Sequence, residues 1–565
     1  MKKIYIHLMM LAAMVVAGAT MVSCSKDETI TGKFNMTVKA SKGGGNAKVL
    51  SLGGTTLSAT WAVGEQVKVY KEEAEIGTLT AQSAGESTTL DGTITGTITP
   101  DDVLTLKFCS PNYTSQLGTL EYIAANCDYA TATVTVASND NGRVTTTDHA
   151  DFVNQQAIVK FTLKDKEDNS INTTKLVVTV GTDDYTITPA RGTDEIFIAI
   201  PGFSGQTVTL SADIADIDHP YYFYSLQKDG VTFNNSQYYE YTVKMARCID
   251  LARMTTETSV TAQNGDVITG TLSYLYHHEE PLYFLSIAAG ATVTLRDAVA
   301  YRYALTCEGN ATITLEGENI LDVSNGYGTS GIYVPSGSKL TIQGSGSLTA
   351  RGAEGCAGIG ANSGNACGNI VINSGTVNAY GKGNYGAGIG GTQHSCGTIT
   401  ITGGEVNAEG AASYGAGSGY GSGYGSGNVS SCGVISITGG TVTAKGGQYG
   451  AGIGSGYRGV CSDISITGGT ITAIGDWGGS SFEIGGSAGI GSGLEGACGD
   501  ITITNTVTSV TATAQYPYYV WQIGNIYGCC IGKGYSASCG TVTIPGEESS
   551  DCISNNTHTY TYPSN

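Results

Sequence analysis

Two stretches of this chain decide its fold. One runs from Cys396 to Gly410 and reads Cys-Gly-Thr-Ile-Thr-Ile-Thr-Gly-Gly-Glu-Val-Asn-Ala-Glu-Gly; the other runs from Cys432 to Gly446 and reads Cys-Gly-Val-Ile-Ser-Ile-Thr-Gly-Gly-Thr-Val-Thr-Ala-Lys-Gly. Cysteines recur near the start of such units at positions 367, 396, 432, 461, 498 and 539. Self-similarity at this spacing is the signature of a stacked repeat architecture.

Each repeat contains three short segments in which apolar and polar residues alternate. Such a segment is predicted to be a strand with one buried face. Glycines between the segments suit tight corners. We therefore predict an all-β chain in which residues 255–545 form a right-handed parallel β-helix of about nine rungs, capped by residues 546–565. The residues predicted to point inward in one rung are Ile399, Ile401, Val406, Ala408, Ala387 and Ile389.

The region before the repeats has a different texture. From residue 30 to residue 253, runs of alternating residues are separated by clusters of Gly, Asn and Asp, which indicates antiparallel β-sandwiches. We expect one sandwich at 30–165 and a second at 166–253. The aromatic residues predicted to lie in their cores are Trp61, Phe108, Phe161 and Phe197.

Four segments of this region, in their order and spacing, resemble the fimbrillin family of Bacteroidetes surface proteins: residues 34–38, 61–70, 152–161 and 239–245. The resemblance implies two transthyretin-like sandwiches and a pilus-related or adhesin-related surface protein. Polymerising members of that family are trimmed at an Arg soon after their anchor. The first Arg here is Arg143, deep in the domain, so we expect the protein to stay anchored and unpolymerised.

The N-terminus has the order of a secretory signal. Residues 1–23 combine two lysines, an apolar stretch and a small residue, and Cys24 follows directly. This order resembles a bacterial lipobox, although Met21 stands where Leu is usual, and the charged linker 24–29 resembles the export tag of surface lipoproteins. The resemblance implies lipidation of Cys24 and a surface-exposed place in the outer membrane. The alternative is a plain signal peptide with Cys24 an incidental thiol.

Composition narrows the classes of partner. The chain has 48 acidic and 28 basic residues, which argues against nucleic acid, because that partner requires a basic face. Seven His residues are scattered without zinc spacing, and the glycine motifs lack the helix that a dinucleotide loop requires. We predict no metal and no cofactor.

The repeated cysteines permit two interpretations. Stacked rungs place corresponding residues about 4.8 Å apart, within the range that a disulfide accepts. The preferred interpretation is a column of small buried residues. Outside the repeats, Cys109 and Cys127 are candidates for a disulfide.

Aromatic residues supply the strongest candidate binding surface. Three tyrosines precede the small-residue, glycine-rich segment of their rung and are predicted to stack in a column, and further aromatics follow in the inserts. Such side chains suit contacts with sugars or proteins, but a structural tyrosine ladder is equally consistent with the pattern. The candidate contact residues are Tyr385, Tyr414, Tyr449, Tyr457, Trp477 and Trp521.

Two functions from different classes follow from these patterns. The first is a non-catalytic adhesin that binds glycan or protein through the β-helix. The second is a polysaccharide lyase or glycoside hydrolase, which requires clustered carboxylates or an acid-plus-base group. Acidic residues in the regular rungs are isolated, and only Glu405 and Glu409 share a strand face. The sequence therefore favours the adhesin, with a structural pilus-related subunit as a further alternative.

Overall fold

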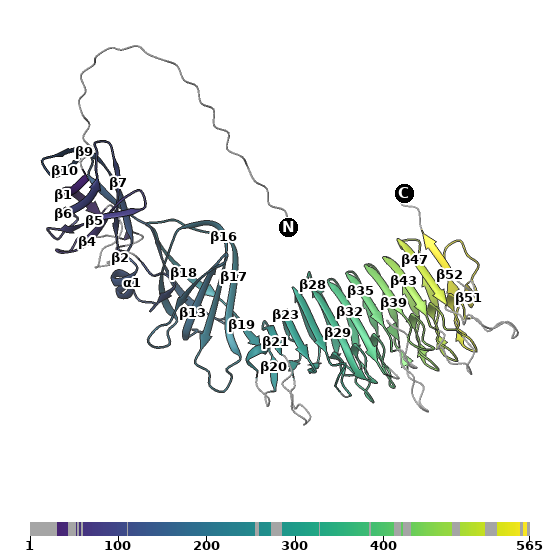
Figure 1. Cartoon of the computed structure of the whole chain (residues 1–565). Coiled ribbons are helices and arrows are strands. Elements are labelled where there is room, and N and C mark those ends of the chain that lie inside the picture. The colour runs from purple at the N-terminus through teal and green to yellow at the C-terminus, as the bar shows by residue number, and fades with distance from the viewer. Residues whose placement is uncertain are drawn as a thin grey trace, which may run out of the picture.

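The structure is a computed structural model, which describes residues 31–42, 52–53, 56–57, 60–109, 111–254, 259–272, 285–326, 328–383, 386–411, 420–421, 431–476, 486–514, 528–553 and 557–561. Figure 1 shows two β domains followed by a long β-helix. Cys24 lies outside the described residues. Among the residues described, no helix has the length and apolar character needed to cross a membrane.

The first domain is a sheet that closes on itself. Strand β1 (Thr31–Lys42) pairs antiparallel with β6 (Ser87–Thr97) on one side and parallel with β10 (Arg143–Thr146) and β11 (Ala150–Asn154) on the other. Because β1 pairs along both of its edges, it links the two layers of the first domain into one closed sheet. The remaining strands are β4 (Gln66–Lys71), β5 (Ala74–Ala81), β7 (Val103–Phe108) and β9 (Ala130–Asp140), with a separate pair β2 (Leu52–Gly53) and β3 (Thr56–Leu57).

Aromatic rings fill the centre of this closed sheet. Trp61 is fully buried and meets Phe108 and Phe152 edge to face, at 5.7 and 5.3 Å between ring centroids. Edge-to-face pairs of this kind add to the stabilisation that area burial provides. The prediction that Trp61 and Phe108 lie in the core is confirmed.

The second domain is a sandwich. A three-stranded sheet of β15 (Glu195–Ile200), β12 (Ala157–Lys164) and β18 (Tyr238–Lys244) packs on a larger sheet through a core that contains Phe161. Phe197 is only partly buried and packs near Ile123 of α1 (Leu120–Asn126). The larger sheet contains β13 (Thr173–Val180), β14 (Asp183–Ile187), β16 (Phe203–Ile214), β17 (Tyr222–Phe233) and β19 (Ala246–Asp250), and β8 (Ser115–Gln116) pairs with β14.

The boundary between the two domains lies earlier than the predicted residue 165. Strand β12 pairs with β15 and β18, so its residues belong to the second sandwich. The residues that follow position 165 join β12 to β13 within one domain. The domain to which β12 belongs is determined by strands that lie far from it in the sequence. A local sequence pattern does not reveal those partners.

The β-helix has three strand columns. In the third column, ten strands run parallel from β20 (Val260–Ala262) to β48 (Ile531–Gly532), and β51 (Cys552–Ile553) closes the stack antiparallel. The intervening members of that column are β22 (Leu285–Ile287), β24 (Leu305–Cys307), β27 (Ile332–Tyr333), β30 (Ile359–Gly360), β33 (Ile389–Gly390), β36 (Tyr420–Gly421), β40 (Ile453–Gly454) and β44 (Ile490–Gly491).

The other two columns share one continuous sheet. The first column contains β21 (Val267–Leu272), β23 (Thr292–Tyr301), β25 (Ala311–Glu316), β28 (Lys339–Gly344), β31 (Asn369–Ile372), β34 (Ile399–Ile401), β38 (Ile435–Ile437), β42 (Ile464–Ile466), β46 (Ile501–Ile503) and β50 (Val542–Thr543). The second contains β26 (Glu318–Asp322), β29 (Ser347–Glu354), β32 (Thr376–Lys382), β35 (Glu405–Glu409), β39 (Thr441–Lys445), β43 (Thr470–Gly475), β47 (Ser509–Ala514) and the antiparallel β52 (Thr557–Thr561).

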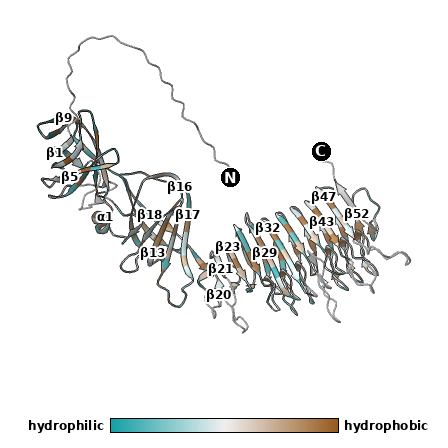
Figure 2. Ribbon diagram, in the orientation of Figure 1, coloured by the Kyte–Doolittle hydropathy of each residue, from teal (hydrophilic) through white to brown (hydrophobic). Residues whose placement is uncertain are grey.

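Inward residues form columns along the helix axis. Ile399, Ile401 and Ile389 have no exposed surface, and each aligns with an identical residue or a larger apolar residue in a neighbouring rung. The predicted inward faces are therefore confirmed. Figure 2 shows the resulting alternation of hydrophobic and hydrophilic residues across the sheets. Because corresponding side chains stack, one continuous core runs through all the rungs.

The second sandwich is joined to the β-helix by backbone pairing. Strand β19 pairs in parallel with β21, with Cys248 opposite Val267. Tyr221 from the sandwich belongs to the same buried cluster as the first rungs. The sandwich therefore covers the N-terminal end of the helix core, which would otherwise expose an open sheet edge.

Candidate functional site

Two of the predicted contact aromatics lie among the described residues, and both are buried. Tyr449 has no exposed surface, and Tyr457 is 6% exposed. Their ring centroids are 5.5 Å apart, and both pack with Leu494. The prediction that these two rings contact a ligand is wrong, because the chain at the corner of the rung folds them between neighbouring rungs. At these two positions the tyrosines are packing residues, as the structural alternative predicted.

The other predicted contact residues are Tyr385, Tyr414, Trp477 and Trp521. All four lie outside the described residues, so their role stays a prediction.

The second column of the β-helix carries a flat polar face. Two ranks of outward residues run across six rungs, and nearly all are Thr, Ser or Asn. One rank is Ser347, Thr376, Glu405, Thr441, Thr470 and Ser509; the other is Thr349, Asn378, Asn407, Thr443, Thr472 and Thr511. We call this surface the hydroxyl–amide face. Its side chains are short and repeat about every 4.8 Å, so hydroxyl and amide groups are presented as a regular array.

Hydrogen bonds between rungs hold parts of this face in place. The Asn407 side-chain amide donates to Asn378 Oδ1 at 3.0 Å. The alternating pattern that predicted the strands also predicted the outward direction of Glu405 and Asn407. The sequence analysis nevertheless missed the face as a candidate site, and the signal was available in the repeated Thr-x-Thr spacing.

Charged side chains of the β-helix pair across rungs. Arg296 lies 2.7 Å from Glu316, Arg458 lies 2.6 Å from Glu495, and Lys445 lies 2.8 Å from Glu409. Glu409 is thereby engaged, so Glu405 and Glu409 do not present two free carboxylates. Among the described residues, no group of three or more His, Cys, Asp or Glu side chains is arranged to hold a metal ion.

The repeated cysteines form a thiol ladder, by which we mean Cys367, Cys396, Cys432, Cys461, Cys498 and Cys539. The last five are aligned in four successive pairs, from Cys396 with Cys432 to Cys498 with Cys539. A glycine follows most of these cysteines, and several thiols donate to the carbonyl oxygen of that glycine in the preceding rung. Cys396, for example, donates to Gly368, which follows Cys367, at 3.7 Å. All but Cys539 are buried thiols.

The predicted Cys109–Cys127 disulfide is absent from the structure. Cys127 is a buried thiol that donates to the Asn112 carbonyl oxygen at 3.7 Å. Its side chain packs with Ile123, whereas Cys109 lies exposed after β7. Burial raises the pKa of the Cys127 thiol to about 11, which keeps it protonated.

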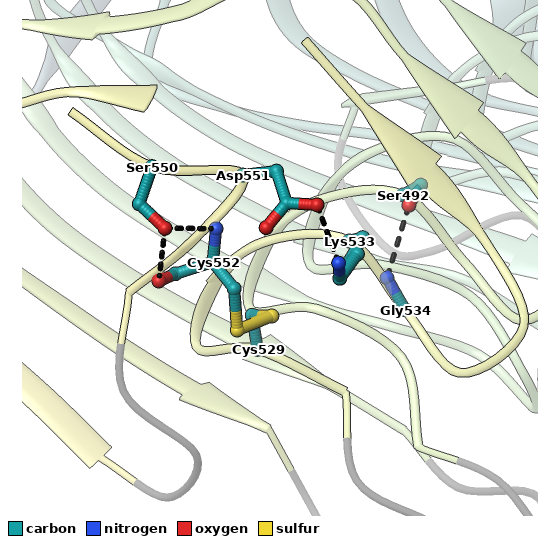
Figure 3. The surroundings of a disulfide bond; sticks show 7 residues. All are labelled: Ser492, Cys529, Lys533, Gly534, Ser550, Asp551 and Cys552. Atoms are coloured by element: carbon teal, nitrogen blue, oxygen red, sulfur yellow. Dashed lines mark hydrogen bonds and ion pairs between the residues drawn. A yellow bond between two sulfur atoms is a disulfide. The ribbon is translucent and has the colours of Figure 1, made fainter. Parts of the chain in front are cut away.

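A different disulfide joins Cys529 to Cys552 at the C-terminal end of the helix. Figure 3 shows it beside an ion pair between Lys533 and Asp551. The bond ties β51, which closes the third column, to the chain that leads into β48. The sequence analysis missed this pair because neither cysteine begins a repeat unit.

A cavity of about 210 Å³ lies at the junction between the second sandwich and the helix. Arg247 and Asp266 meet in it through two hydrogen bonds of 3.0 and 2.7 Å. The hydrogen bond with Asp266 raises the pKa of Arg247 above its usual value. Lys166 Nζ donates to the Gly265 carbonyl oxygen at 2.9 Å. The side chains of Arg247, Asp266 and Lys166 are therefore used in contacts between the two domains.

The first domain contains a buried group of charges. Lys42 lies 3.0 Å from Glu65, with side chains that are 3% and 5% exposed, and Lys42 Nζ lies 4.0 Å from the Phe108 ring centroid. Burial raises the pKa of the nearby Asp128 carboxyl to about 7; Lys42 and a hydrogen bond from Gln156 oppose the rise.

The repeats match a known family model. Residues 340–364, 370–392, 399–428, 435–457 and 464–494 match the beta helix repeat. This agrees with the parallel columns described above. No curated protein matches the chain.

Several solved structures resemble part of the chain. A fimbrial protein from Bacteroides ovatus has 12% identity and a TM-score of 0.20, over 38% of this chain and 49% of that one. A proposed cell adhesion protein from the same species has 13% identity and a TM-score of 0.23, over 39% and 95%. The C-terminally truncated tip fimbrial protein of Porphyromonas gingivalis has 9% identity and a TM-score of 0.20, over 38% and 95%. This chain thus spans about half the length of the first of them.

Proposed function

We propose that this protein is a non-catalytic adhesin of the bacterial surface that binds glycans through the hydroxyl–amide face of its β-helix. The supporting observation is the face itself, whose two ranks repeat regularly and include one charged side chain, Glu405. The next outward rank of the same strands holds Arg351, Glu409 and Lys445, which mark the charged border of the face. Sugars present many hydroxyl groups, and a repeated array of hydroxyl and amide side chains offers them several simultaneous hydrogen bonds. Charged side chains of the helix are paired, and this includes Glu409 with Lys445 at the border of the face, which gives less support to the alternative of a polysaccharide lyase or hydrolase.

The experiment is a glycan array with the mature chain, residues 24–565. Two changes on the hydroxyl–amide face, Thr443→Lys with Thr472→Lys, are expected to weaken binding at least tenfold, because the new side chains lift a ligand from the surface. The matched control is Ser436→Lys with Ser465→Lys, which places the same charges on the outward side of the first column in the same two rungs. We expect the control to bind as the unchanged protein does.

The array also distinguishes the enzyme. Absence of binding, together with release of reducing ends from a polysaccharide, would overturn the adhesin and favour the hydrolytic alternative. Equal binding by both double variants would remove the hydroxyl–amide face from the proposal.

Lipidation of Cys24 places the adhesin at the outer membrane in this proposal. Changing Cys24→Ala is expected to abolish incorporation of a labelled fatty acid and to release the protein from the membrane fraction. Protease treatment of intact cells then tests surface exposure, since a lipoprotein that faces the periplasm is protected. A labelled, membrane-bound Cys24→Ala protein would contradict the anchor.

A further inference from the structure

The thiol ladder is uniform along most of its length and different at its end. Four strands form its corner sheet: β37 (Ser431–Cys432), β41 (Val460–Cys461), β45 (Ala497–Cys498) and β49 (Ser538–Cys539). Because β49 is the last of these, no further strand of that sheet among the described residues covers its cysteine. Cys539 is accordingly half-buried, whereas Cys432 and Cys461 are 2% and 1% exposed.

Cys498 and Cys539 are direct register partners. Adjacent parallel strands place their Cα atoms about 4.8 Å apart, inside the range of about 4.4–6.8 Å that disulfides span. The Cys539 thiol donates to the carbonyl oxygen of Gly499, the residue that follows Cys498, at 3.6 Å, so its sulfur lies toward the preceding rung. Little rearrangement therefore separates the dithiol from a bonded pair.

The surroundings of Cys539 lower the pKa of its thiol relative to that of Cys498. The hydrogen bond from Cys498 lowers the pKa of the Cys539 thiol and Lys533 assists, while burial, Asp551 and Asp500 oppose the shift. The pKa of Cys498 is raised by the same hydrogen bond and by burial. Since the thiolate is the nucleophile in exchange, Cys539 is both the accessible member of the pair and the reactive one.

We propose that Cys498 and Cys539 form a reactive dithiol that exchange with an external disulfide converts into a disulfide between rungs. The Cys539 thiolate attacks one sulfur of the external disulfide, which forms a mixed disulfide and expels a thiolate. The expelled thiolate takes the proton of Cys498, whose sulfur then attacks the Cys539 sulfur and expels a second thiolate. That thiolate takes from solvent the proton that Cys539 released when it ionised. Two protein thiols are oxidised and one external disulfide is reduced to two thiols.

The product ties the last strand of the corner sheet to the rung before it. Together with Cys529–Cys552, which holds the cap of the third column, it closes the C-terminal end of the helix at two corners. The deeper thiols, from Cys367 to Cys461, are at most 6% exposed and on this proposal stay reduced.

The test uses the mature chain treated with oxidised glutathione at pH 8, alkylated without reduction and mapped by peptide mass spectrometry. We expect a linked peptide that contains Cys498 and Cys539 and lacks two hydrogens, with Cys432 and Cys461 alkylated only after unfolding. In Cys498→Ser, we expect a glutathione adduct that persists on Cys539. The matched control Cys461→Ser, one rung earlier, should still form the linked peptide.

Three results would overturn the proposal: an unreactive Cys539, an adduct that persists on Cys539 in the unchanged protein, or a link from Cys539 to Cys529 or Cys552. Mapping of the unchanged protein decides the matter even if the Cys498→Ser variant fails to fold.

Discussion

At the scale of single residues, Tyr449 illustrates how burial removes a chemically suitable side chain from a binding surface. Its φ of 62° is in the left-handed region, and its ring packs against Tyr457 and Leu494. A residue other than glycine accepts this backbone conformation only when the surrounding structure stabilises it. The packing of the ring provides that stabilisation.

Changing Tyr449→Ala is expected to lower the free energy of unfolding by about 3 kcal/mol, because a buried aromatic ring is lost and a cavity remains. The control is Tyr380→Ala, since Tyr380 is partly exposed and lies beneath Arg351 at 4.2 Å. Thermal unfolding measures both. A Tyr449 variant as stable as the control would show that the ring contributes no core packing.

Asp128 predicts an unusual pH dependence of stability. Its pKa is about 7 in the folded protein, against roughly 4 in an unfolded chain. Between these values the folded state holds a proton that the unfolded state has lost, so this group makes the protein less stable as pH rises from about 4 to 7.

The variant Asp128→Asn removes that titration and keeps an oxygen that accepts from Gln156. We expect it to be more stable than the unchanged protein at pH 8, by about 2 kcal/mol, and to match it more closely at pH 5. Urea unfolding at both pH values measures the difference. A gap that is the same at both would show that Asp128 does not titrate in this range.

At the scale of elements, glycines of the third column set how closely the rungs approach. A Cβ at Gly491 would overlap the carbonyl oxygen of Gly532, and φ there is 136°. At Gly290, φ is 82°, but nothing lies within 4 Å of the added atom. A substitution at Gly491 therefore meets both steric overlap and an unfavourable φ, whereas a substitution at Gly290 meets the unfavourable φ alone.

Gly491→Ala is therefore expected to destabilise the helix more than Gly290→Ala, which carries only the cost of a positive φ, roughly 1 kcal/mol. Comparison of the two melting temperatures measures the contribution of close rung contact. Equal melting temperatures would show that the rungs shift apart at little cost.

The repeat made the β-helix predictable from sequence. Alternation fixed the faces of Ile399 and Val406, because any shift of one residue would turn apolar side chains outward. The placement of β12 and the burial of Tyr449 were not predictable in this way. Both depend on contacts between segments far apart in sequence, and so does the pairing of Cys529 with Cys552.

At the scale of the whole molecule, the junction determines whether the sandwich and the helix move together. Arg247 and Asp266 are bonded through two contacts, and the Asp266 side chain is 5% exposed. Removing one partner of a buried pair leaves an uncompensated charge, which is strongly destabilising.

Arg247→Ala is expected to speed hydrogen exchange at the amides of β19 and β21, where the two domains pair, by at least tenfold. The control is Lys244→Ala, which removes an exposed ion pair with Asp168 in the same sandwich. Amide exchange followed by mass spectrometry measures both variants. Unchanged exchange in Arg247→Ala would show that backbone pairing and apolar contacts suffice at the junction.

The stacking of rungs also means that the length of the β-helix is set by the number of its rungs. Because each rung pairs only with its two neighbours, a duplication or loss of one repeat unit changes the length of the rod by about 4.8 Å. Neither the sandwich that covers one end nor the disulfide-bonded cap at the other has to change. A gain or loss of one repeat unit within the gene would therefore change the length of the helix in uniform steps.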